Sequence, residues 1–216
     1  GSAPQTQRPR AGFYRMIFPS ATEHHPHIIV IGSVYPEDVG DIQRIADARL
    51  GPGYISAANL LADSHQTVFA AWRGHRLAGF LSASLSSLAD IRRDTPALGA
   101  LLAGQPESSA PIGFLHAVAV DKAHEKQGIG TELIAYALDT FFLPHKASMA
   151  ITTAWSDNQG VHVGGPLHRN EFRKIGYLEN YWHADSLARG YECPTCGKPP
   201  CRCTASIFAK SLLVAT

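Results

Sequence analysis

Cysteine is scarce in this sequence and confined to one place. Among 216 residues there are four cysteines, at positions 193, 196, 201 and 203, so no disulfide can join distant parts of the chain. Small secreted proteins that depend on disulfides distribute cysteines along their length. Cysteine therefore serves one local site here, and the rest of the chain is long enough to fold on its own hydrophobic core.

An excess of one charge and long apolar runs are also missing. Nineteen Lys and Arg against eighteen Asp and Glu leave a formal charge of +1, which gives no electrostatic footprint for nucleic acid or an anionic membrane. No apolar run approaches the length of a membrane span, and no signal peptide is visible. We predict a soluble, cytoplasmic protein with neither nucleic acid nor membrane as a partner.

The organisation is that of one folded domain behind a tail. Residues 1–25 are rich in Pro, Arg, Gln and Ser and are predicted to be an N-terminal tail, followed by a domain over residues 26–216. Hydrophobic patterns predict strands at 28–34, 67–72, 77–84, 148–154 and 205–214, and helices at 36–50, 56–62 and 167–174.

The most informative stretch runs over residues 113–142. An apolar run at 114–120 is typical of a buried strand, a polar loop ends on Gly128-Ile129-Gly130, and the apolar positions from 129 to 142 follow one helical stripe. The start of such a helix leaves backbone N–H groups unpaired, and with the helix dipole they form an anion site suited to phosphate. Glycines at this point let a ligand approach the backbone closely.

This loop matches neither common nucleotide loop, because it lacks the Gly-Lys-Ser/Thr of a P-loop and the third glycine of the dinucleotide motif. The stretch instead resembles the acetyl-CoA signature of the GNAT N-acetyltransferase superfamily, Arg/Gln-x-x-Gly-x-Gly/Ala after a central strand. Leu115-His116-Ala117-Val118-Ala119-Val120 is also similar to that strand in serotonin-type (arylalkylamine) acetyltransferases.

The resemblance implies an α/β fold with a mixed, mostly antiparallel central sheet flanked by helices, whose two central strands splay apart around the coenzyme. It also implies acetyl-CoA as co-substrate. The residues expected to contact the coenzyme are Val118, Ala119, Val120, Lys126, Gln127, Gly128, Ile129, Gly130, Thr131 and Asn158. Relative to the family, residues 85–111 are an insertion with helical pieces at 87–93 and 96–103, and we predict a flap near the acceptor mouth.

Two positions depart from the family pattern. Glu125 occupies a place where Arg or Gln is usual, and a carboxylate near a pyrophosphate weakens binding unless it points away. Phe172 replaces the tyrosine of the family's Tyr-Glu-Lys-x-Gly-Phe segment and cannot protonate the leaving coenzyme. His168, four residues earlier on the predicted helix, is the candidate substitute, with Tyr177 and Tyr181 as alternatives.

His116 has two interpretations. A primary alkylammonium has a pKa of about 10, so a base with a pKa of about 6.5 to 7 is useful, and histidine meets this requirement. A histidine in an apolar strand is otherwise a core residue bonded to a backbone carbonyl. The resemblance favours catalysis, since this strand position faces the acceptor in the serotonin-type enzymes and serves deprotonation through water.

Cys193-Pro194-Thr195-Cys196-Gly197 followed by Cys201-Arg202-Cys203 is typical of a zinc knuckle. In a C-x2-C turn, backbone N–H groups point at the sulfurs, and the glycine tolerates a left-handed backbone. Two disulfides in so short a loop are the strained alternative. We therefore predict a structural Zn²⁺ held by Cys193, Cys196, Cys201 and Cys203, in a loop over residues 190–204 that the ordinary GNAT domain lacks.

These features predict an N-acetyltransferase that moves acetyl from acetyl-CoA to an amine by direct attack in a ternary complex. A small arylalkylamine is the first choice of acceptor, on the strength of His116. A protein or peptide N-acetyltransferase is the alternative within the enzyme class. A non-catalytic coenzyme A-binding module that holds a partner with its zinc loop is the alternative outside it. Besides the amine or peptide, a homodimer is a possible assembly.

Overall fold

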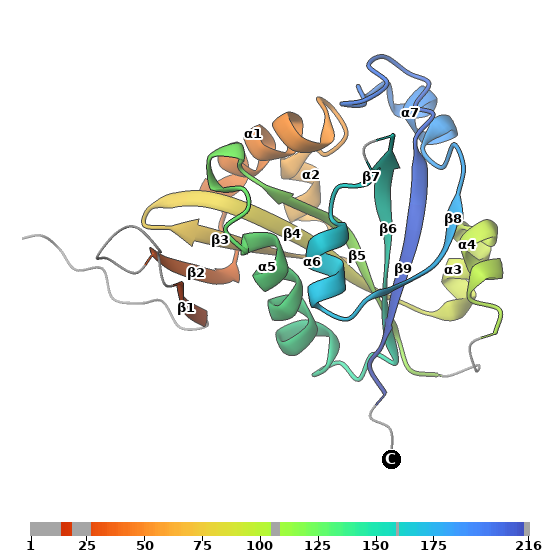
Figure 1. The fold of residues 1–216 in the computed structure, drawn as a ribbon, viewed down its shortest axis with the longest axis horizontal. Coiled ribbons are helices and arrows are strands. Elements are labelled where there is room, and N and C mark those ends of the chain that lie inside the picture. Colours follow the sequence, from red (N-terminus) through yellow and green to blue (C-terminus); the bar gives the residue numbers. More distant parts are fainter. Residues whose placement is uncertain (1–13, 19–26, 105–108, 159, 214–216) are drawn as a thin grey trace, which may run out of the picture.

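The computed structural model describes residues 14–18, 27–104, 109–158 and 160–213. One twisted sheet runs through them in the strand order β1-β2-β3-β4-β5-β6-β9-β8, with the short β7 paired to β6 (Figure 1). The strands are β1 Tyr14–Phe18, β2 His27–Ser33, β3 Gln66–Arg73, β4 Arg76–Ser86, β5 Ile112–Val120, β6 Met149–Asp157, β7 Gly160–Val161, β8 Arg173–Leu178 and β9 Thr204–Ser211.

Two central strands separate in the middle of this sheet. All neighbouring pairs are antiparallel except β5 and β6, which run parallel. Their pairing joins Ile112 to Met149 and ends with Leu115 opposite Thr152. The far edge of each strand stays bonded, β5 to β4 as far as Val120 and β6 to β9 as far as Ser156. The predicted splayed, mostly antiparallel α/β fold is confirmed.

Helices cover both faces of the sheet. On one face α5 (Ile129–Ala137), which continues as the π-helical turn η3 (Leu138–Phe142), packs with α6 (Gly164–Arg169). On the other face lie the turn η1 (Pro36–Asp38), α1 (Val39–Leu50) and α2 (Ala57–Ala62). Leu81 of β4 belongs to the core under α5, whereas its neighbour Phe80 belongs to the core under α1. Because consecutive strand residues point to opposite faces, the two helical layers enclose the sheet.

The described part of the insertion, residues 85–104 and 109–111, forms a packed layer and not the predicted flap. Its helices α3 (Leu88–Asp94) and α4 (Pro96–Leu101) join a third core cluster with β6 and β9, in which Leu98 and Leu102 are fully buried. Neither helix contributes a residue to the two cavities described below. Leu101 packs against Gly176 of β8, and a Cβ added to this glycine would lie 2.9 Å from Leu101 Cδ2. The insertion therefore closes the core at this end of the sheet.

Several elements differ from the sequence prediction. Tyr14–Phe18, assigned to the tail, pairs with β2 as β1; the rest of that tail lies outside the described residues. The helix expected over 167–174 is α6, which ends at Arg169 because Glu171 adopts a left-handed backbone, with φ +62. The chain then continues as the edge strand β8, and α7 (His183–Arg189) follows unpredicted. The last strand ends at Ser211.

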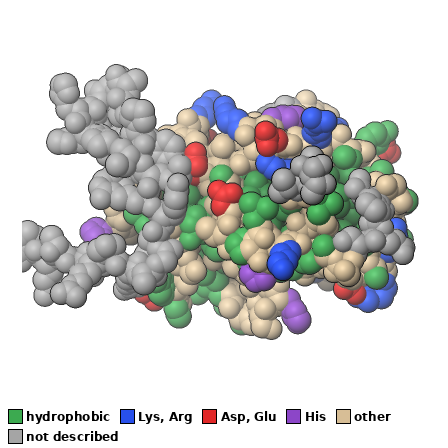
Figure 2. All heavy atoms as spheres, turned by 90° about the horizontal axis from the view of Figure 1, so that it is seen from below, with side chains coloured by type: hydrophobic (Ala, Val, Ile, Leu, Met, Phe, Trp, Pro, Cys, Tyr) green, Lys and Arg blue, Asp and Glu red, His purple; other side chains and the backbone are tan. Residues whose placement is uncertain are grey.

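The described part of the chain includes no helix that is both long enough and apolar enough to cross a bilayer. Figure 2 shows the molecule from below, and on this face the coloured acidic and basic side chains are interspersed. Neither charge forms a broad patch among the side chains coloured there, as the nearly neutral composition leads one to expect.

Candidate active site

The gap between β5 and β6 opens into a cleft of about 1020 Å³. Its walls come from β5 beyond Leu115, from the loop and first turn of α5, from β6 beyond Thr152, from α6 and from the cysteine loop. Ladder pairing with β6 ends at Leu115, so the edge of β5 between His116 and Val120 faces the cleft. An extended ligand can use these backbone groups as a partner strand does.

The first turn of α5 forms an anion site at the wide end of the cleft. The first N–H bonded within this helix is that of Glu132, which donates to Gly128 O at 3.1 Å, so the amides of residues 129–131 have no intrahelical acceptor. Gly128, the N-cap, has φ +82, a left-handed conformation that glycine adopts without strain. These amides and the positive end of the helix dipole favour a phosphate here.

The residues predicted to hold the coenzyme lie together, with one exception. All of the predicted positions on β5 and in the loop line the cleft, namely Val118, Ala119, Val120, Lys126, Gln127, Gly128, Ile129, Gly130 and Thr131. Asn158 does not, because it is exposed at the turn after β6, whereas its neighbours Trp155 and Asp157 line the cleft. Arg169 of α6 also lines it and adds a cation that the sequence pattern did not indicate.

Glu125, the departure from the family motif, has a cationic partner. Its carboxylate forms an ion pair with Arg49 at the end of α1, and both residues line the cleft. Each side chain is about one-third exposed, so the pair contributes no more than about 1 kcal/mol to stability. The pair offsets the repulsion that a lone carboxylate would exert on a phosphate.

His116 lies where β5 bulges. Ser82 of β4 pairs with Ala117 and Ala83 pairs with Leu115, so His116 has no partner of its own on β4. A bulge changes which face the following side chains point to. Here it places both His116 and Ala117 toward the face covered by α1 and α2.

The imidazole of His116 is held on two sides and accessible on others. Its Nε2 lies 2.7 Å from Ser84 Oγ, and its ring stacks on Phe114 with centroids 4.6 Å apart. The residue is exposed to both cavities and is therefore not the enclosed core histidine of the alternative interpretation. The surrounding protein desolvates the ring and lowers its pKa to about 4, which leaves it neutral at pH 7.

A second, smaller pocket of about 260 Å³ lies on the α2 side of the sheet. It meets the large cleft at Tyr54, His116 and Ala117, which line both. Polar side chains dominate its other walls: Ser56, Asn59, Asp63, Gln66, Ser82 and Arg189. Asp63 accepts from the amide of His65, which keeps the pKa of its carboxyl below the usual range, and Gln66 Oε1 is buried without a hydrogen-bond partner among the described residues.

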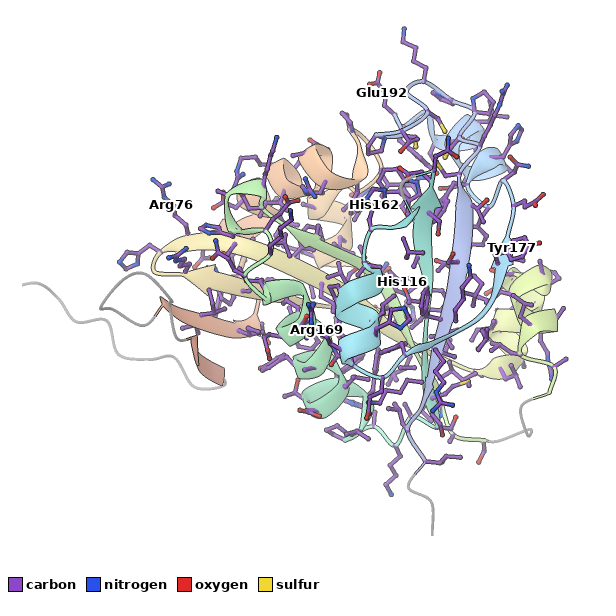
Figure 3. The ribbon with its side chains drawn as sticks, in the orientation of Figure 1. Arg76, His116, His162, Arg169, Tyr177 and Glu192 are labelled. Atoms are coloured by element: carbon purple, nitrogen blue, oxygen red, sulfur yellow. The ribbon has the colours of Figure 1, made fainter. Side chains whose placement is uncertain are left out.

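The predicted substitutes for a general acid lie outside both cavities. Phe172 is 1% exposed in the core, and His168 packs edge-on against Phe208 with centroids 5.6 Å apart. Tyr177 is 58% exposed on the edge strand β8, away from the cleft (Figure 3), and Tyr181 is in neither lining. The position of His168 therefore gives its predicted catalytic role no support.

Two tyrosines and a histidine are among the other cleft residues that the sequence analysis missed. Tyr54 of the α1–α2 connection, Tyr191 after α7 and His162 after β7 all line the large cleft. Burial raises the pKa of Tyr54 and that of Tyr191, so both hydroxyls remain protonated donors at pH 7. No motif in the sequence signals these residues, because each comes from a connection of irregular pattern.

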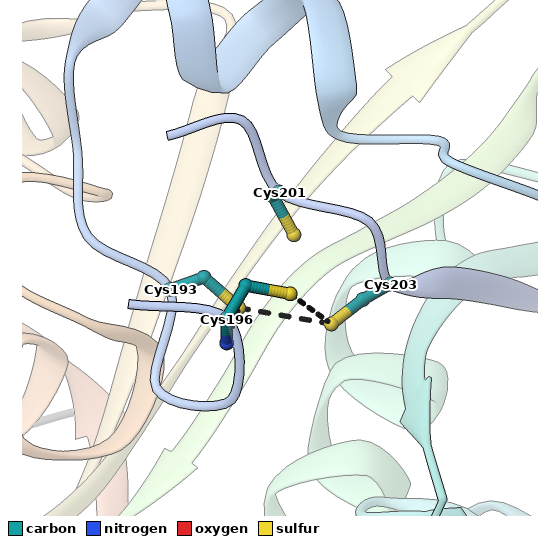
Figure 4. A group of neighbouring side chains, drawn as sticks. All are labelled: Cys193, Cys196, Cys201 and Cys203. Carbon is teal, nitrogen blue, oxygen red and sulfur yellow. Dashed lines mark hydrogen bonds between the residues drawn. The ribbon is translucent and has the colours of Figure 1, made fainter. Parts of the chain in front are cut away.

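The four cysteine sulfurs form one compact cluster (Figure 4). All lie within 4.8 Å of one another, with Cys203 Sγ 3.7 Å from Cys193 Sγ and 3.5 Å from Cys196 Sγ. A tetrahedron of thiolates around Zn²⁺ has edges of about 3.8 Å, for a Zn–S bond of about 2.3 Å, whereas a disulfide needs about 2.0 Å. The spacing fits a four-thiolate metal site.

The backbone around the cluster has the features of a zinc knuckle. The amide of Cys196 donates to Cys193 Sγ and that of Arg202 donates to Cys196 Sγ, both at 3.4 Å. Gly197 has φ +74, and its amide and carbonyl exchange 2.8 Å hydrogen bonds with Cys193. Without a cation, burial raises the pKa of Cys201 to about 11 and also raises that of Cys203. A bound metal supplies the charge that lets these thiols ionise.

The cysteine loop is also a wall of the large cleft. Cys193, Pro194, Thr195 and Cys201 line it, beside Trp155 of β6 and Trp182 at the start of α7. The loop is anchored below by Ser186, whose hydroxyl accepts from the amide of Cys201 at 2.8 Å, and by the amide of Glu192, which donates to Pro52 O. Any metal bound here therefore holds part of the cleft in place.

Comparisons with known proteins agree with this geometry. The model of the Acetyltransferase (GNAT) family matches residues 37–162. NAA60 from Arabidopsis thaliana in complex with a bisubstrate analogue superposes with a TM-score of 0.62 at 15% identity, over 85% of this chain and 97% of that one. The ribosomal-protein-S18-alanine N-acetyltransferase from Escherichia coli gives 0.59 at 15% identity, over 87% and 96%.

An IAA acetyltransferase from Bacillus cereus has the same fold, with a TM-score of 0.56 at 15% identity over 85% of this chain and 99% of that one. No curated protein matches the sequence significantly. At these identities the solved structures show the fold alone. The family match, which covers more than half of the chain, together with the splayed strands and the amide site at α5, shows that the chain belongs to the GNAT family of acetyltransferases.

Proposed function

We propose that this GNAT enzyme transfers the acetyl group of acetyl-CoA to the primary amine of a small arylalkylamine, by direct attack in a ternary complex. The observation that carries the proposal is the position of His116. It lies on the bulge of β5, at the junction between the coenzyme cleft and the smaller pocket. A neutral imidazole there is within reach of both substrates.

The coenzyme enters with its phosphates at the first turn of α5 and its arm along the free edge of β5. The amides of residues 129–131 and the cations Lys126 and Arg169 receive the pyrophosphate. The arm pairs with the backbone beside Val118 and Val120, as an added strand would. This places the thioester near His116, where the two central strands begin to separate.

Aromatic walls support an arylalkylamine as acceptor. Tyr54, Trp155, Trp182 and Tyr191 line the cleft on the side of the cysteine loop, and the rings of Tyr54 and Tyr191 meet edge-on with centroids 5.0 Å apart. Stacking on such walls favours an aromatic substituent. Asp63 and the unpaired Gln66 Oε1 in the smaller pocket offer acceptors to the ammonium group.

The neutral state of His116 fits a proton acceptor but a weak one. An alkylammonium with a pKa of about 10 has to lose a proton before it attacks. A pKa of about 4 ensures that His116 has a free lone pair throughout the neutral range, although a base nearer pH 7 transfers protons more efficiently. The leaving thiol has a pKa of about 8.5 and departs as thiolate without a strong acid, so the core position of Phe172 is tolerated.

We also propose that the cysteine loop binds one structural Zn²⁺. Four thiolates complete a tetrahedral shell and leave no position for water or substrate. The ion would hold the wall formed by Pro194 and Thr195 and would take no part in the chemistry.

A peptide N-terminus is the second candidate acceptor. The polar side chains of Ser56, Asn59 and Gln66 in the smaller pocket suit a peptide backbone better than an aromatic ring. One protein of the same fold, the Escherichia coli ribosomal-protein-S18-alanine N-acetyltransferase, acts on an alanine of a protein by its name. A coenzyme A-binding module without catalysis is the remaining alternative.

One assay separates these functions. Amine-dependent release of free thiol from acetyl-CoA would be measured with arylalkylamines, aliphatic amines and short peptides. We expect the largest kcat/KM with an arylalkylamine; preference for peptides would favour the second candidate. Thermal stabilisation by acetyl-CoA with no thiol release from any acceptor would indicate the binding module.

His116→Ala should lower kcat/KM by about 10²-fold at pH 7 and by much less at pH 9, where about a hundredfold more of the amine is already neutral. The pH profile of kcat/KM with saturating acetyl-CoA measures this. An equal loss at both pH values would indicate that the substitution acts through packing on Phe114 and not through proton transfer.

A further inference from the structure

Another imidazole besides that of His116 lines the large cleft, at a position that no sequence motif indicates. His162 follows β7, the short strand that pairs with the end of β6 on the side of the gap (Figures 1 and 3). Its amide donates to Trp155 O at 3.4 Å, and its ring stacks on the indole of Trp155 with centroids 4.7 Å apart. The ring is therefore fixed in the cleft by backbone and side-chain contacts together.

Asp157 fixes which nitrogen carries the proton. Its Oδ2 lies 2.9 Å from His162 Nε2, and the same oxygen accepts from Thr195 Oγ1 at 2.8 Å. The carboxylate side chain is only 8% exposed, whereas that of His162 is 45% exposed. An ionised carboxylate only accepts, so Nε2 is the protonated nitrogen and Nδ1 keeps its lone pair. A base oriented by a third group is a recurrent arrangement in catalysis.

Both imidazoles open on the same face of the divided sheet. Phe114, which stacks on His116, packs in the same cluster as Ile151 and Trp155. Ala154, the neighbour of Trp155, belongs to the opposite core under α5. Since His162 stacks on Trp155, its ring lies on the face of His116, which is the acceptor side of the cleft.

We propose that His162, oriented by Asp157, is the second proton acceptor for the incoming amine; this inference rests on the proposed acetyl transfer. Nδ1 takes the one proton that the ammonium group loses before attack, for which His116 is only a transient acceptor, and the carboxylate of Asp157 stabilises the imidazolium formed. The freed lone pair attacks the thioester carbon, the C–S bond breaks, and the second nitrogen-bound proton passes to the departing sulfur. The products are the amide, coenzyme A thiol and one proton, which His162 returns to solvent.

The surroundings of the two rings decide which imidazole retains the proton that the amine loses. Among the described residues, His116 is bonded to the hydroxyl of Ser84 and to no carboxylate, whereas His162 is bonded to Asp157. The other charged or titratable groups lining the cleft on the elements around His162 are His116, Arg169, Tyr191, Cys193 and Cys201. A carboxylate partner is what allows an imidazole to hold the proton it receives.

The cysteine loop has a positioning role in this arrangement. Thr195 lies between Cys193 and Cys196, and its hydroxyl is bonded to Asp157. The loop therefore positions the carboxylate of Asp157, and that carboxylate in turn orients the imidazole of His162. This link connects the order of the cysteine loop to proton transfer without any contact between the metal site and the substrates.

Two substitutions of His162 test the proposal on the full chain with the best amine of the panel. His162→Gln keeps a donor for Asp157 but has no base, and His162→Ala leaves room for free imidazole. We expect each to lower kcat about 10²-fold at pH 7 and markedly less at pH 9, with an acetyl-CoA thermal shift like that of the parent chain. Added imidazole should restore part of the activity of His162→Ala. Thr195→Val should lower kcat several-fold.

His75→Gln, at an exposed histidine on the β3–β4 turn, is the matched control and should leave kcat unchanged. If the parent chain releases thiol with an amine and both His162 variants stay within twofold of it from pH 6.5 to 9, the inference is overturned and the proposed function stands. A loss of equal size at both pH values, without rescue by imidazole, also overturns it. A parent chain without amine-dependent thiol release would instead remove the proposed function itself.

Discussion

The proposed coenzyme half and the proposed acceptor half of this enzyme are built in different ways. One continuous stretch, from β5 to the first turn of α5, forms most of the proposed coenzyme half, where backbone amides would do much of the binding. The proposed acceptor half is assembled from α2, β4, the β6–β7 hairpin, α7 and the cysteine loop, where side chains would do the binding. A local site made of backbone tolerates sequence change, while a dispersed site made of side chains can be remodelled one connection at a time.

The two halves also differ in what holds them together. The first turn of α5 lies on a large core, in which Leu133 and Ile134 are fully buried between α5 and the sheet. The cysteine loop has little apolar packing of its own besides the sulfurs and Tyr191. A metal is the natural substitute for a core in such a loop. Substitutions that act on one half and spare the other will sharpen this comparison.

The largest effect is expected at the proposed metal site. Cys196→Ser removes an exposed ligand, so any loss comes from the metal and not from core packing. We expect zinc to fall from one ion per chain to well below one. Stability should fall by about 5 kcal/mol, which lowers Tm by roughly 10–20 °C, and the KM for the amine should rise while acetyl-CoA affinity changes little. Elemental analysis, calorimetry and steady-state kinetics measure these quantities.

Cys196→His is the matched control for this prediction, because three cysteines and one histidine also bind zinc tetrahedrally. It should keep most of the metal and of the stability. A parent chain purified without chelator that contains no zinc, or whose thiols titrate as disulfides, would contradict the metal assignment.

A clear but smaller effect is expected at the proposed phosphate site. Acetyl-CoA at a hundredfold excess over Kd should stabilise the chain by about 2.7 kcal/mol, a rise in Tm of roughly 5–10 °C. Gly128→Glu should abolish this rise, because a side chain and a negative charge then occupy the phosphate site. Differential scanning fluorimetry with and without acetyl-CoA measures the difference.

Gly74→Glu controls for backbone strain, since Gly74 also has a positive φ, +61, and has open space around it on the β3–β4 turn. Both variants should lose about 1–2 kcal/mol of intrinsic stability. Only Gly128→Glu should lose the response to acetyl-CoA. Retention of the full response in Gly128→Glu would show that the phosphates bind elsewhere.

The smallest effect, and one of opposite sign, is expected at the departure from the family motif. Glu125→Gln releases Arg49 from its ion pair and removes a negative charge from the cleft. Because exposed ion pairs contribute about 0–1 kcal/mol, acetyl-CoA affinity should rise by no more than about fivefold, and less at high salt. Isothermal titration calorimetry at two salt concentrations measures this.

Glu171→Gln is the matched control, since Glu171 pairs with Lys210 outside both cavities. It should leave coenzyme affinity unchanged. Weaker binding by Glu125→Gln would mean that the ion pair orders the loop before the coenzyme arrives. This ordering would then raise acetyl-CoA affinity by more than the negative charge lowers it.

The secondary structure was predictable where the pattern was long and local. The strand and helix over residues 113–142 carry a continuous apolar run followed by a helical stripe, and both elements formed as expected. β8 was not predictable, because its residues are largely exposed and it exists only by pairing with β9. One helix was predicted over residues 167–174, yet the left-handed backbone of Glu171 leaves Leu167 in a helix and Phe172 at a core position before a strand.

By itself the sequence determined the family, the coenzyme loop and the identity of the four cysteines, since each depends on residues close together in the chain. Only the tertiary structure decided which side chains line the large cleft and the smaller pocket. The fold placed His116 on a bulge, turned Glu125 toward Arg49 and left His168 outside the cleft. It also brought His162 into the wall of the cleft. The reason is physical: spacing along the chain defines a turn of helix or a knuckle, whereas strand register and sheet faces set which distant residues meet.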